Sequence, residues 1–233
     1  MNKLVAVTGG TKGIGRAILE KFASQGFDLI TCARKKVDLD KLKLHFEKSG
    51  VKVFAEVADM ADKSQVKKFT EFVNSLNRPL DVLVNNAGFF TPGLVTEEPD
   101  GALESMINSN VYSAYYTTRG LVGRMKANKA GHIFNMCSIA SIKAYPNGGS
   151  YAISKFALLG FSKVLREELK EDGIRVTAIL PGATRTASWD GVALPEDRFM
   201  KPEDVADAVY AAYALSGRSV IEEMVIRPQL GDI

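Results

Sequence analysis

The residues best suited to chemistry are a tyrosine and a lysine one helical turn apart. Tyr151 and Lys155 lie in the sequence Tyr-Ala-Ile-Ser-Lys, four positions apart, so they share one face of a helix. A free phenol has a pKa of about 10, and a neighbouring cation favours the phenolate and lowers that pKa. The pair therefore predicts a general acid–base that exchanges a proton with a carbonyl or alcohol oxygen. The alternative is an ordinary tyrosine and lysine on a helix surface.

A serine hydroxyl is expected at the same site. Ser138 ends an apolar, strand-like stretch thirteen residues before Tyr151, and a hydroxyl there can donate to a substrate oxygen that gains negative charge. A nucleophilic serine would need a base, and neither His45 nor His132 stands in a fitting context. Neither histidine has a partner at metal-ligand spacing, so we expect no metal site.

A glycine-rich segment near the N-terminus predicts a phosphate site. The first apolar run leads into Thr-Gly-Gly-Thr-Lys-Gly-Ile-Gly at 8–15, and a helical pattern follows directly. Glycine lets the backbone approach a ligand closely, and a helix N-terminus offers unpaired N–H groups to a pyrophosphate. The spacing is G-x-x-x-G-x-G rather than G-x-G-x-x-G, so a turn with spare glycines is the alternative. The candidate cofactor contacts are Gly9, Thr11, Lys12, Gly13, Ile14 and Gly15.

The second strand-like run ends in a basic segment that bears on the choice of dinucleotide. NAD-binding proteins place Asp or Glu there to bind the ribose 2′-OH, whereas this chain has Arg34, Lys35 and Lys36, with Asp38 beyond them. Arginine binds a 2′-phosphate through paired, charge-assisted hydrogen bonds, and Lys12 adds a second cation. We therefore predict NADP(H) as the cofactor, with a solvated basic turn as the alternative.

Alternating strand and helix patterns predict how these residues are positioned. Short runs rich in Val, Ile, Leu and Phe, typical of parallel strands covered on both faces, occur at 4–8, 29–33, 51–57, 82–85, 133–137, 176–180 and 219–226. Helical patterns occur at 14–25, 38–49, 63–76, 101–126, 150–171 and 202–215. Asp62 is the expected N-cap of the third helix, and Pro202 suits the first turn of the last. The alternation predicts an α/β fold with a doubly wound, mostly parallel seven-stranded, Rossmann-like sheet and helices on both faces.

The whole chain, residues 1–233, is expected to form one dinucleotide-binding and catalytic domain. One stretch interrupts the alternation: residues 183–201 follow the sixth strand and contain Trp189, Asp190 and Phe199. A loop between a strand and a helix is usually only a few residues long, and ligands bind at the carboxyl ends of such strands. We therefore predict a lid-like insertion here, with a decorated surface loop as the alternative.

The composition limits the class of protein. With 46% hydrophobic and 24% charged residues, the chain suits a folded domain rather than a disordered or collagen-like protein. A net charge of +3 gives no electrostatic case for nucleic-acid binding. The apolar N-terminal run is too short for a signal peptide or a membrane span. Cys32 and Cys137 lie in apolar runs, so we expect reduced cysteines in a cytoplasmic protein without membrane contact.

Taken in their order along the chain, these motifs resemble those of the short-chain dehydrogenase/reductase family, in its compact, single-domain and NADP-preferring branch. The resemblance covers nearly the whole chain. The motifs that carry it are TGGTKGIG at 8–15, NNAG at 85–88, Asn110, Ser138, the YxxxK of Tyr151 and Lys155, and Pro181-Gly182 with Thr186.

The resemblance implies a role for each motif. Tyr151 would be the general acid–base, Lys155 would lower the pKa of Tyr151 and bind the cofactor ribose, and Ser138 would orient the carbonyl. Asn110 would hold a water in a proton relay to Lys155. Further cofactor contacts would be Asp59 and Met60 at the adenine, Asn86, Ala87 and Gly88 in the NNAG motif, and Pro181, Gly182, Thr184 and Thr186 around the nicotinamide.

The implied reaction is the reversible, NADPH-dependent reduction of a ketone or aldehyde to an alcohol. A 3-oxoacyl-[acyl-carrier-protein] reductase is the close alternative, for which a basic patch near the pocket would face the acyl-carrier partner. The residues that could form this patch are Arg119, Arg124, Lys126 and Lys129. A non-catalytic NADP(H) sensor is a further alternative, although such proteins usually lack the tyrosine or the lysine.

The resemblance also implies partners. The helices that carry Asn110 and Tyr151 often pair between subunits in this family, so a homodimer or homotetramer is expected. The pocket for a small-molecule carbonyl substrate would be lined by Phe89 and Phe90, by residues 139–150 and by the 183–201 insertion. These segments carry few charges, which favours a ketone with an apolar or modestly anionic body.

Overall fold

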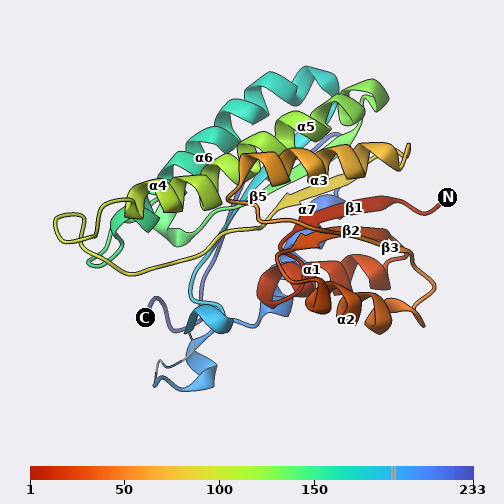
Figure 1. The fold of residues 1–233 in the computed structure, drawn as a ribbon. Coiled ribbons are helices and arrows are strands. Elements are labelled where there is room, and N and C mark those ends of the chain that lie inside the picture. The colour runs from red at the N-terminus through yellow and green to blue at the C-terminus, as the bar shows by residue number, and fades with distance from the viewer. Residues whose placement is uncertain (190, 192) are drawn as a thin grey trace.

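Seven parallel strands form the centre of the computed structural model, which describes residues 1–189, 191 and 193–233 (Figure 1). The strands are β1 Leu4–Thr8, β2 Asp28–Ala33, β3 Val53–Val57, β4 Val82–Asn85, β5 Gly131–Met136, β6 Ile174–Pro181 and β7 Glu223–Ile226. Their order across the sheet is β3-β2-β1-β4-β5-β6-β7, and every neighbouring pair is parallel. The predicted doubly wound, Rossmann-like sheet is confirmed.

The strands are apolar along their length because helices cover the sheet on both faces. In β1, Val5 and Val7 belong to the core on one face, whereas Leu4 and Ala6 belong to the core on the other. Each of these four side chains is at most 1% exposed. Burial of apolar surface stabilises the fold by about 25 cal/mol per Å², so both faces of each central strand contribute to stability.

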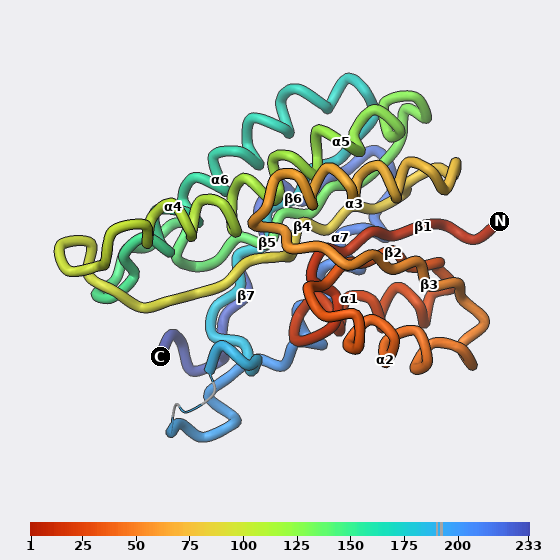
Figure 2. The backbone as a smooth tube through the Cα atoms, viewed as in Figure 1, coloured from red at the N-terminus to blue at the C-terminus, as the bar shows by residue number. Residues whose placement is uncertain are grey.

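Two sets of helices form the outer layers (Figures 1 and 2). One face of the sheet packs against α1 Gly13–Ser24, α2 Lys36–Phe46 and α7 Pro202–Ala214. The other packs against α3 Lys63–Ser75, α5 Ser113–Asn128 and α6 Gly149–Leu169. The chain therefore alternates strand and helix as predicted, and each helix returns the chain to the amino edge of the sheet.

Local sequence signals mark two helix starts as predicted. Asp62 caps α3, because its Oδ1 accepts a hydrogen bond from the Ser64 N–H at 2.7 Å. Pro202 is the first residue of α7. Proline costs no hydrogen bond at this position, because the N–H of the first helical residue has no partner within the helix. The strand predicted at 219–226 is shorter than expected, since pairing with β6 begins only at Glu223.

The continuous helix predicted over 101–126 is wrong in its middle. The structure has α4 at Ala102–Ile107, a π-helical turn at Asn108–Tyr112, and then α5. A π turn widens the helix locally, and such turns are frequent at functional sites. Asn110 lies in this turn, so the interruption affects one of the predicted site residues.

The 183–201 segment connects β6 to α7. It contains short 3-10 turns at Ala187–Trp189 and Glu196–Arg198, and a bridge between Thr184 and Met200 closes its base. Residues 190 and 192 of the predicted insertion lie outside the described residues.

Candidate active site

The glycine-rich loop and the NNAG segment meet where the strand order reverses. From β1 the chain continues to β2 and β3 on one side, whereas β4 begins the series on the other side. Open α/β sheets bind ligands in the crevice at such a point, outside the carboxyl ends of the strands. Both motifs follow strands that end there, because β1 and β4 are hydrogen-bonded neighbours.

Asn86 connects the NNAG segment to the glycine-rich loop through hydrogen bonds. Its Nδ2 donates to the carbonyl oxygens of Thr8 at 2.9 Å and Gly9 at 3.3 Å. The Thr8 hydroxyl in turn accepts from the backbone N–H groups of Asn86 and Ala87, at 3.0 and 2.9 Å. The side chain of Asn86, predicted as a cofactor contact, therefore holds the shape of the glycine-rich loop.

The glycine-rich loop packs closely against the start of α1. A Cβ atom at Gly15 would lie 2.6 Å from the Gly9 carbonyl oxygen, so only glycine fits there. Lys12, the N-cap residue of α1, makes no side-chain capping bond, and the first turn contains no acidic residue. Helix N–H groups without a cap, next to a close-packed glycine loop, suit a phosphate group. Thr11 in this loop and Ile14 in the first turn of α1 are half-buried.

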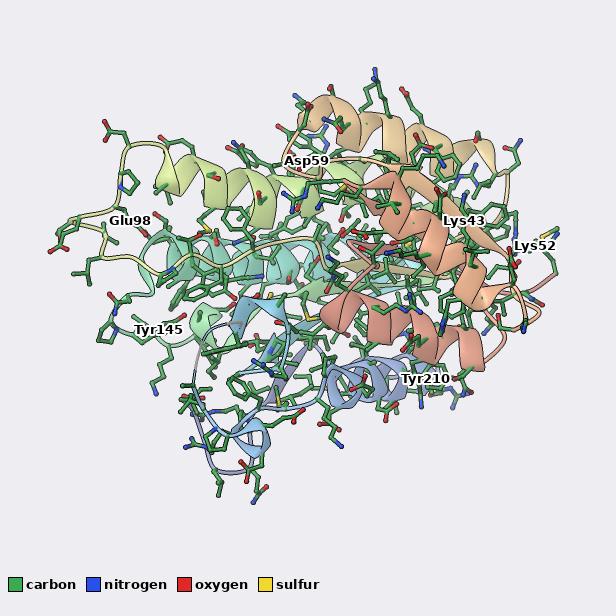
Figure 3. All side chains as sticks on the ribbon, turned by 60° about the horizontal axis from the view of Figure 1, so that its bottom comes forward. Lys43, Lys52, Asp59, Glu98, Tyr145 and Tyr210 are labelled. Carbon is green, nitrogen blue, oxygen red and sulfur yellow. The ribbon has the colours of Figure 1, made fainter. Side chains whose placement is uncertain are left out.

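Basic groups stand beside the end of β2, at the other end of the crevice. Arg34 is exposed, and no ion pair holds it within the described part of the chain. Lys12 Nζ lies 3.9 Å from the carboxylate of Asp38, so this carboxylate is closer to the expected phosphate position than its place in the sequence suggested. Asp59, labelled in Figure 3, follows β3 and accepts a hydrogen bond from the backbone N–H two residues further on at 3.0 Å. Met60 is buried.

Tyr151, Ser138 and Lys155 come together at the carboxyl end of β5. Ser138 lies two residues beyond β5, and the other two share one face of α6, with Lys155 Nζ 5.6 Å from the centre of the Tyr151 ring. The ammonium of Lys155 donates to the Met136 carbonyl at 2.7 Å. Phe90, predicted to line the pocket, packs edge-on against Tyr151 with ring centres 4.8 Å apart.

The acidity of this pair differs from the sequence prediction. We predicted that Lys155 lowers the pKa of Tyr151, but burial raises the pKa of Tyr151, and a hydrogen bond with Ser138 offsets only part of that rise. Burial also lowers the pKa of Lys155 to about 8. Removal from water disfavours the charged form of each group, and the ammonium is hydrogen-bonded to the Met136 carbonyl. The phenol is therefore protonated at neutral pH and suited to donate a proton.

Burial of Lys155 makes stability depend on pH. The pKa of this group is about 8 in the folded protein, against 10.5 for a lysine free in water. Below pH 8 Lys155 is protonated in both the folded and the unfolded protein, so the folded state bears the full cost of burying a charged ammonium. Between pH 8 and 10.5 Lys155 is protonated only in the unfolded chain, so the free energy of unfolding rises with pH. The free energy of unfolding should increase by about 2 kcal/mol more in wild type than in Lys155→Met between pH ~7.5 and ~9.5. Urea unfolding of both proteins at the two pH values measures this, and an equal change in both would contradict it.

Asn110 joins the loop after β4 to α6. Its Nδ2 donates to Ser154 Oγ at 2.9 Å and to the Phe89 carbonyl at 3.1 Å, and its Oδ1 accepts from the Phe89 N–H at 2.9 Å. Gly88 permits this approach, since a Cβ there would lie 2.6 Å from Asn110 Oδ1. The side chain therefore positions two walls of the site, and its role in a water relay stays a prediction.

Glu98 is a site residue that the sequence analysis missed. Its carboxylate accepts from the Ser150 N–H at 3.0 and 3.3 Å and also from the Ser150 hydroxyl. Ser150 immediately precedes Tyr151, and no side chain of the helix itself caps α6. Figure 3 shows Glu98 and Tyr145 at the same end of the molecule. A carboxylate at a helix N-terminus is stabilising, so Glu98 fixes the first turn of α6 from a loop 52 residues earlier.

Replacing Glu98 with alanine should loosen this turn. We expect a loss of stability of about 1 kcal/mol, as for removal of a helix cap, together with a several-fold lower activity because Tyr151 is next to the lost contact. Glu98→Gln, which keeps an acceptor oxygen, should fall between wild type and Glu98→Ala. Chemical unfolding and steady-state rates measure both effects. Exposed Glu97 provides the control, and equal effects of Glu97→Ala and Glu98→Ala would contradict the capping role.

The residues predicted around a nicotinamide lie at the end of β6. Pro181 is the last residue of β6, and Thr184 Oγ1 donates to the Gly182 carbonyl at 3.1 Å. Thr186 reaches the glycine-rich loop, where a Cβ at Gly13 would lie 3.1 Å from its Cγ2. Gly13 has a φ of +53°, which disfavours other residues. The start of the 183–201 segment therefore lies against the start of α1.

The predicted basic patch does not face the pocket. Arg119 donates to the Tyr115 hydroxyl at the surface of α5, and Arg124 donates to Asn74 between α3 and α5. Lys126 pairs with an aspartate just before β6 at 2.8 Å. These residues follow α5 towards the amino edge of the sheet, because helices between parallel strands run back from the carboxyl edge. The patch proposed for an acyl-carrier partner is therefore on the wrong edge.

The described residues lack the features of two other classes of protein. No helix among them is long and apolar enough to cross a membrane. They also contain no group of three or more His, Cys, Asp or Glu side chains that could hold a metal ion.

Known proteins match this architecture and sequence closely. The family model for short chain dehydrogenase matches residues 3–196. A sepiapterin reductase from Chlorobaculum tepidum is 32% identical over 100% of this chain and 99% of its own length. An alcohol dehydrogenase from Thermococcus sibiricus, solved with 5-hydroxy-NADP, has a TM-score of 0.91 at 26% identity and covers 98% of this chain and 97% of its own. L-sorbose reductase from Gluconobacter frateurii, solved with NADPH and L-sorbose, has a TM-score of 0.90 at 30% identity, covering 97% and 95%.

Proposed function

The chain belongs to the short-chain dehydrogenase/reductase family, and we propose that it is an NADPH-dependent oxidoreductase that reversibly reduces a ketone or aldehyde to an alcohol. The observation that carries this proposal is the convergence of Ser138, Tyr151 and Lys155 at the sheet edge that also holds the glycine-rich loop. A protein that only binds a dinucleotide has no need for a half-buried phenol beside a buried ammonium.

NADP(H) is the cofactor that we propose for the crevice. Gly15 and the uncapped start of α1 suit its pyrophosphate, and the exposed Arg34 beside Lys12 suits a 2′-phosphate. Both solved relatives described above carry an NADP-type ligand. When bound, the reduced nicotinamide supplies the hydride, and the protein supplies position and charge.

The residues of the chain would orient the carbonyl and move the proton. Ser138 Oγ accepts from the Ala140 N–H at 3.1 Å, and its hydroxyl, hydrogen-bonded to the Tyr151 phenol in this structure, would turn to donate to a substrate oxygen. Tyr151 is protonated at neutral pH and would donate to the same oxygen as negative charge develops there. Lys155, held by the Met136 carbonyl, would bind the cofactor ribose and place a positive charge beneath the phenol. Asn110 would hold a water that connects Lys155 to solvent.

Consumption of NADPH over a panel of carbonyl compounds tests the proposal. The panel should contain simple ketones and aldehydes, L-sorbose, sepiapterin and 3-oxoacyl thioesters. We propose sepiapterin as a specific second candidate because the identity to a sepiapterin reductase extends over the full chain. Turnover of any small carbonyl supports a reductase, and turnover of thioesters alone would indicate the acyl-carrier alternative. NADPH binding without turnover of any compound would indicate the sensor.

We also propose that the protein forms a homodimer or homotetramer through α5 and α6. Large apolar side chains are exposed along α6, where Ile153, Phe156 and Val164 are 42%, 47% and 56% exposed. Helical spacing places the first two of these residues next to each other, and a second helix pair would cover them. Sedimentation velocity tests this assembly: wild type should sediment as a dimer or tetramer, and Phe156→Glu should dissociate. A cytoplasmic location remains a prediction.

A further inference from the structure

The last residues of the chain fold back to form a compact loop. Gly231, with a φ of +85°, closes a turn in which its N–H donates to the Pro228 carbonyl at 2.9 Å. This turn brings the Asp232 carboxylate onto Arg227, whose Nε and Nη2 donate to its two oxygens at 2.9 and 2.5 Å. Such a two-pronged contact is stronger and better oriented than a single ion pair.

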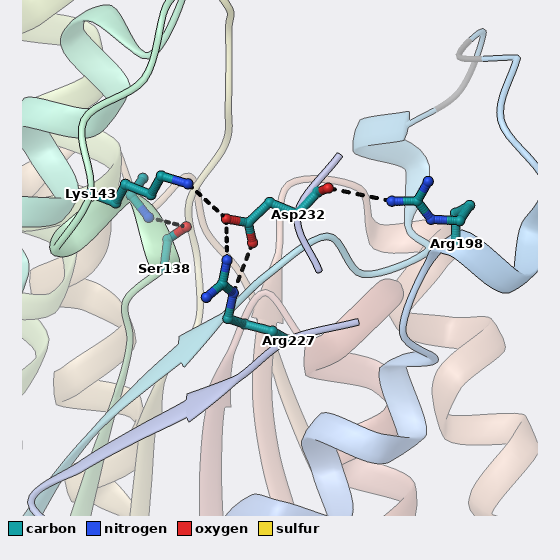
Figure 4. A network of polar contacts seen from close by, with 6 residues as sticks. Ser138, Lys143, Arg198, Arg227 and Asp232 are labelled. Carbon is teal, nitrogen blue, oxygen red and sulfur yellow. Dashed lines mark hydrogen bonds and ion pairs between the residues drawn. The ribbon is translucent and has the colours of Figure 1, made fainter. Parts of the chain in front are cut away.

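Asp232 also binds two other segments at the site (Figure 4). Its carboxylate lies 3.2 Å from Lys143 Nζ, in the segment that follows Ser138. Its backbone carbonyl accepts from Arg198 Nη2 in the 183–201 segment at 3.3 Å. One residue near the chain end therefore contacts both segments that were predicted to line the substrate pocket.

The base of this tail rests on the predicted nicotinamide loop. The Gly182 N–H donates to the Ile226 carbonyl at 2.7 Å. A Cβ at Gly182 would lie 3.0 Å from Pro228 Cδ, so the tail packs directly on this glycine. The tail is thus part of the wall at the carboxyl edge of β6 rather than a free end.

Charge explains why Asp232 can hold these segments together. Lys143 and Arg227 bring two positive charges to the Asp232 carboxylate, whereas Arg198 donates to the backbone carbonyl of the same residue. Hydrogen bonding to Arg227 keeps the pKa of Asp232 below its usual range, so the carboxylate is charged at neutral pH. Without this carboxylate, Lys143 and Arg227 repel one another, and the turn that presents the Asp232 carbonyl to Arg198 loses its two-pronged contact with Arg227.

We propose that Asp232 is a positioning residue that latches the Glu196–Arg198 turn and the loop after Ser138 to the C-terminal tail, and so fixes the shape of the carbonyl-substrate pocket. This inference rests on the proposed function for its kinetic consequences. The contact itself is independent of catalysis and can be measured without turnover.

Asp232→Asn tests the latch kinetically. At saturating NADPH, KM for the carbonyl substrate should rise by about three- to tenfold, in keeping with the modest strength of partly exposed ion pairs, while kcat and the Kd for NADPH change little. Asp232→Glu, which keeps the charge, should restore most of the loss. Raising the salt concentration should increase KM in wild type but not in Asp232→Asn, because ions screen the latch.

Asp172 gives a matched control. It forms an ion pair with Lys126 at 2.8 Å, just before β6 at the amino edge of the sheet. Asp172→Asn makes the same chemical change away from the crevice and should leave KM unchanged. An unaltered KM in Asp232→Asn, or an equal rise in Asp172→Asn, would overturn the latch.

A double-mutant cycle with Lys143 separates a latch from direct substrate contact. If Asp232 acts through Lys143, then Lys143→Met and Asp232→Asn should together raise KM little more than either change alone. Effects on KM that simply multiply, or that occur only for substrates with positively charged groups, would show that Asp232 contacts the substrate itself and would refute the latch.

The single tryptophan of the chain reports on the latch without any turnover. Trp189 lies in the 183–201 segment, with its ring 5.1 Å from that of Phe199, next to Arg198. Asp232→Asn should increase acrylamide quenching of Trp189 and hydrogen exchange over 139–148 and 193–201, whereas Asp172→Asn should not. If these readouts change but no carbonyl is reduced, the proposed function fails and the latch stands. If they do not change, the latch fails whatever the activity.

Discussion

Replacing Tyr151 with phenylalanine is expected to lower kcat for carbonyl reduction by about 10²- to 10⁴-fold, the usual contribution of a positioned general acid. The Kd for NADPH should stay at the wild-type value. Only the hydroxyl is removed, and the ring can keep its packing against Phe90, 4.8 Å away. Because burial raises the pKa of this phenol, the proton lost in the variant is one that the wild-type enzyme holds at neutral pH.

Single-turnover oxidation of NADPH measures this effect, and quenching of the lone tryptophan, Trp189, measures binding. Tyr210→Phe is the control, since Tyr210 packs on Phe22 in the layer formed by α1 and α7, with ring centres 5.4 Å apart. It removes a phenol hydroxyl without touching the crevice. Retained turnover in Tyr151→Phe would remove Tyr151 from its proposed role, whereas loss of NADPH binding would show that the residue supports the cofactor instead.

The fold could be predicted because the strands of a covered parallel sheet have little freedom in composition. Leu4–Thr8 is apolar at successive positions because helices lie on both faces of β1, and such runs alternate with helical periods along the chain. The interruption at Asn108–Tyr112 could not be predicted in the same way. A π turn inserts a change of pitch without changing which types of residue are buried, so periodicity continues across it.

In the candidate site, too, some features follow from local sequence patterns and others depend on the folded chain. Glycine spacing and the spacing of Tyr151 and Lys155 are local patterns, and the structure places these motifs at one edge of the sheet. The direction of the Tyr151 pKa depends on burial by distant segments, which no local pattern contains. Glu98 and Asp232 act on partners 52 and 89 residues away. Only the folded chain brings these carboxylates to their partners, and a surface glutamate or aspartate looks the same in sequence.

Replacing Arg34 with aspartate is expected to lower kcat/KM for NADPH relative to NADH by at least about tenfold, which corresponds to about 1.4 kcal/mol. In the described part of the chain no ion pair occupies Arg34, so its guanidinium is available to a 2′-phosphate. An aspartate there repels that phosphate and accepts from a ribose 2′-OH. The carboxylate of Asp38, 3.9 Å from Lys12, already offsets part of the second positive charge, and Arg34 therefore carries most of the preference.

Lys36→Asp is the matched control for this experiment. It makes the same change of charge two residues away, but Lys36 already pairs with Asp40 at 2.8 Å within α2. General electrostatics would reduce NADPH use in both variants, because charges at this separation act on the phosphate over similar distances. A specific contact affects Arg34→Asp alone. The ratio of the two cofactors also cancels any loss of folded protein, so an unchanged ratio in Arg34→Asp can only mean that the 2′-phosphate is bound elsewhere or is not part of the cofactor.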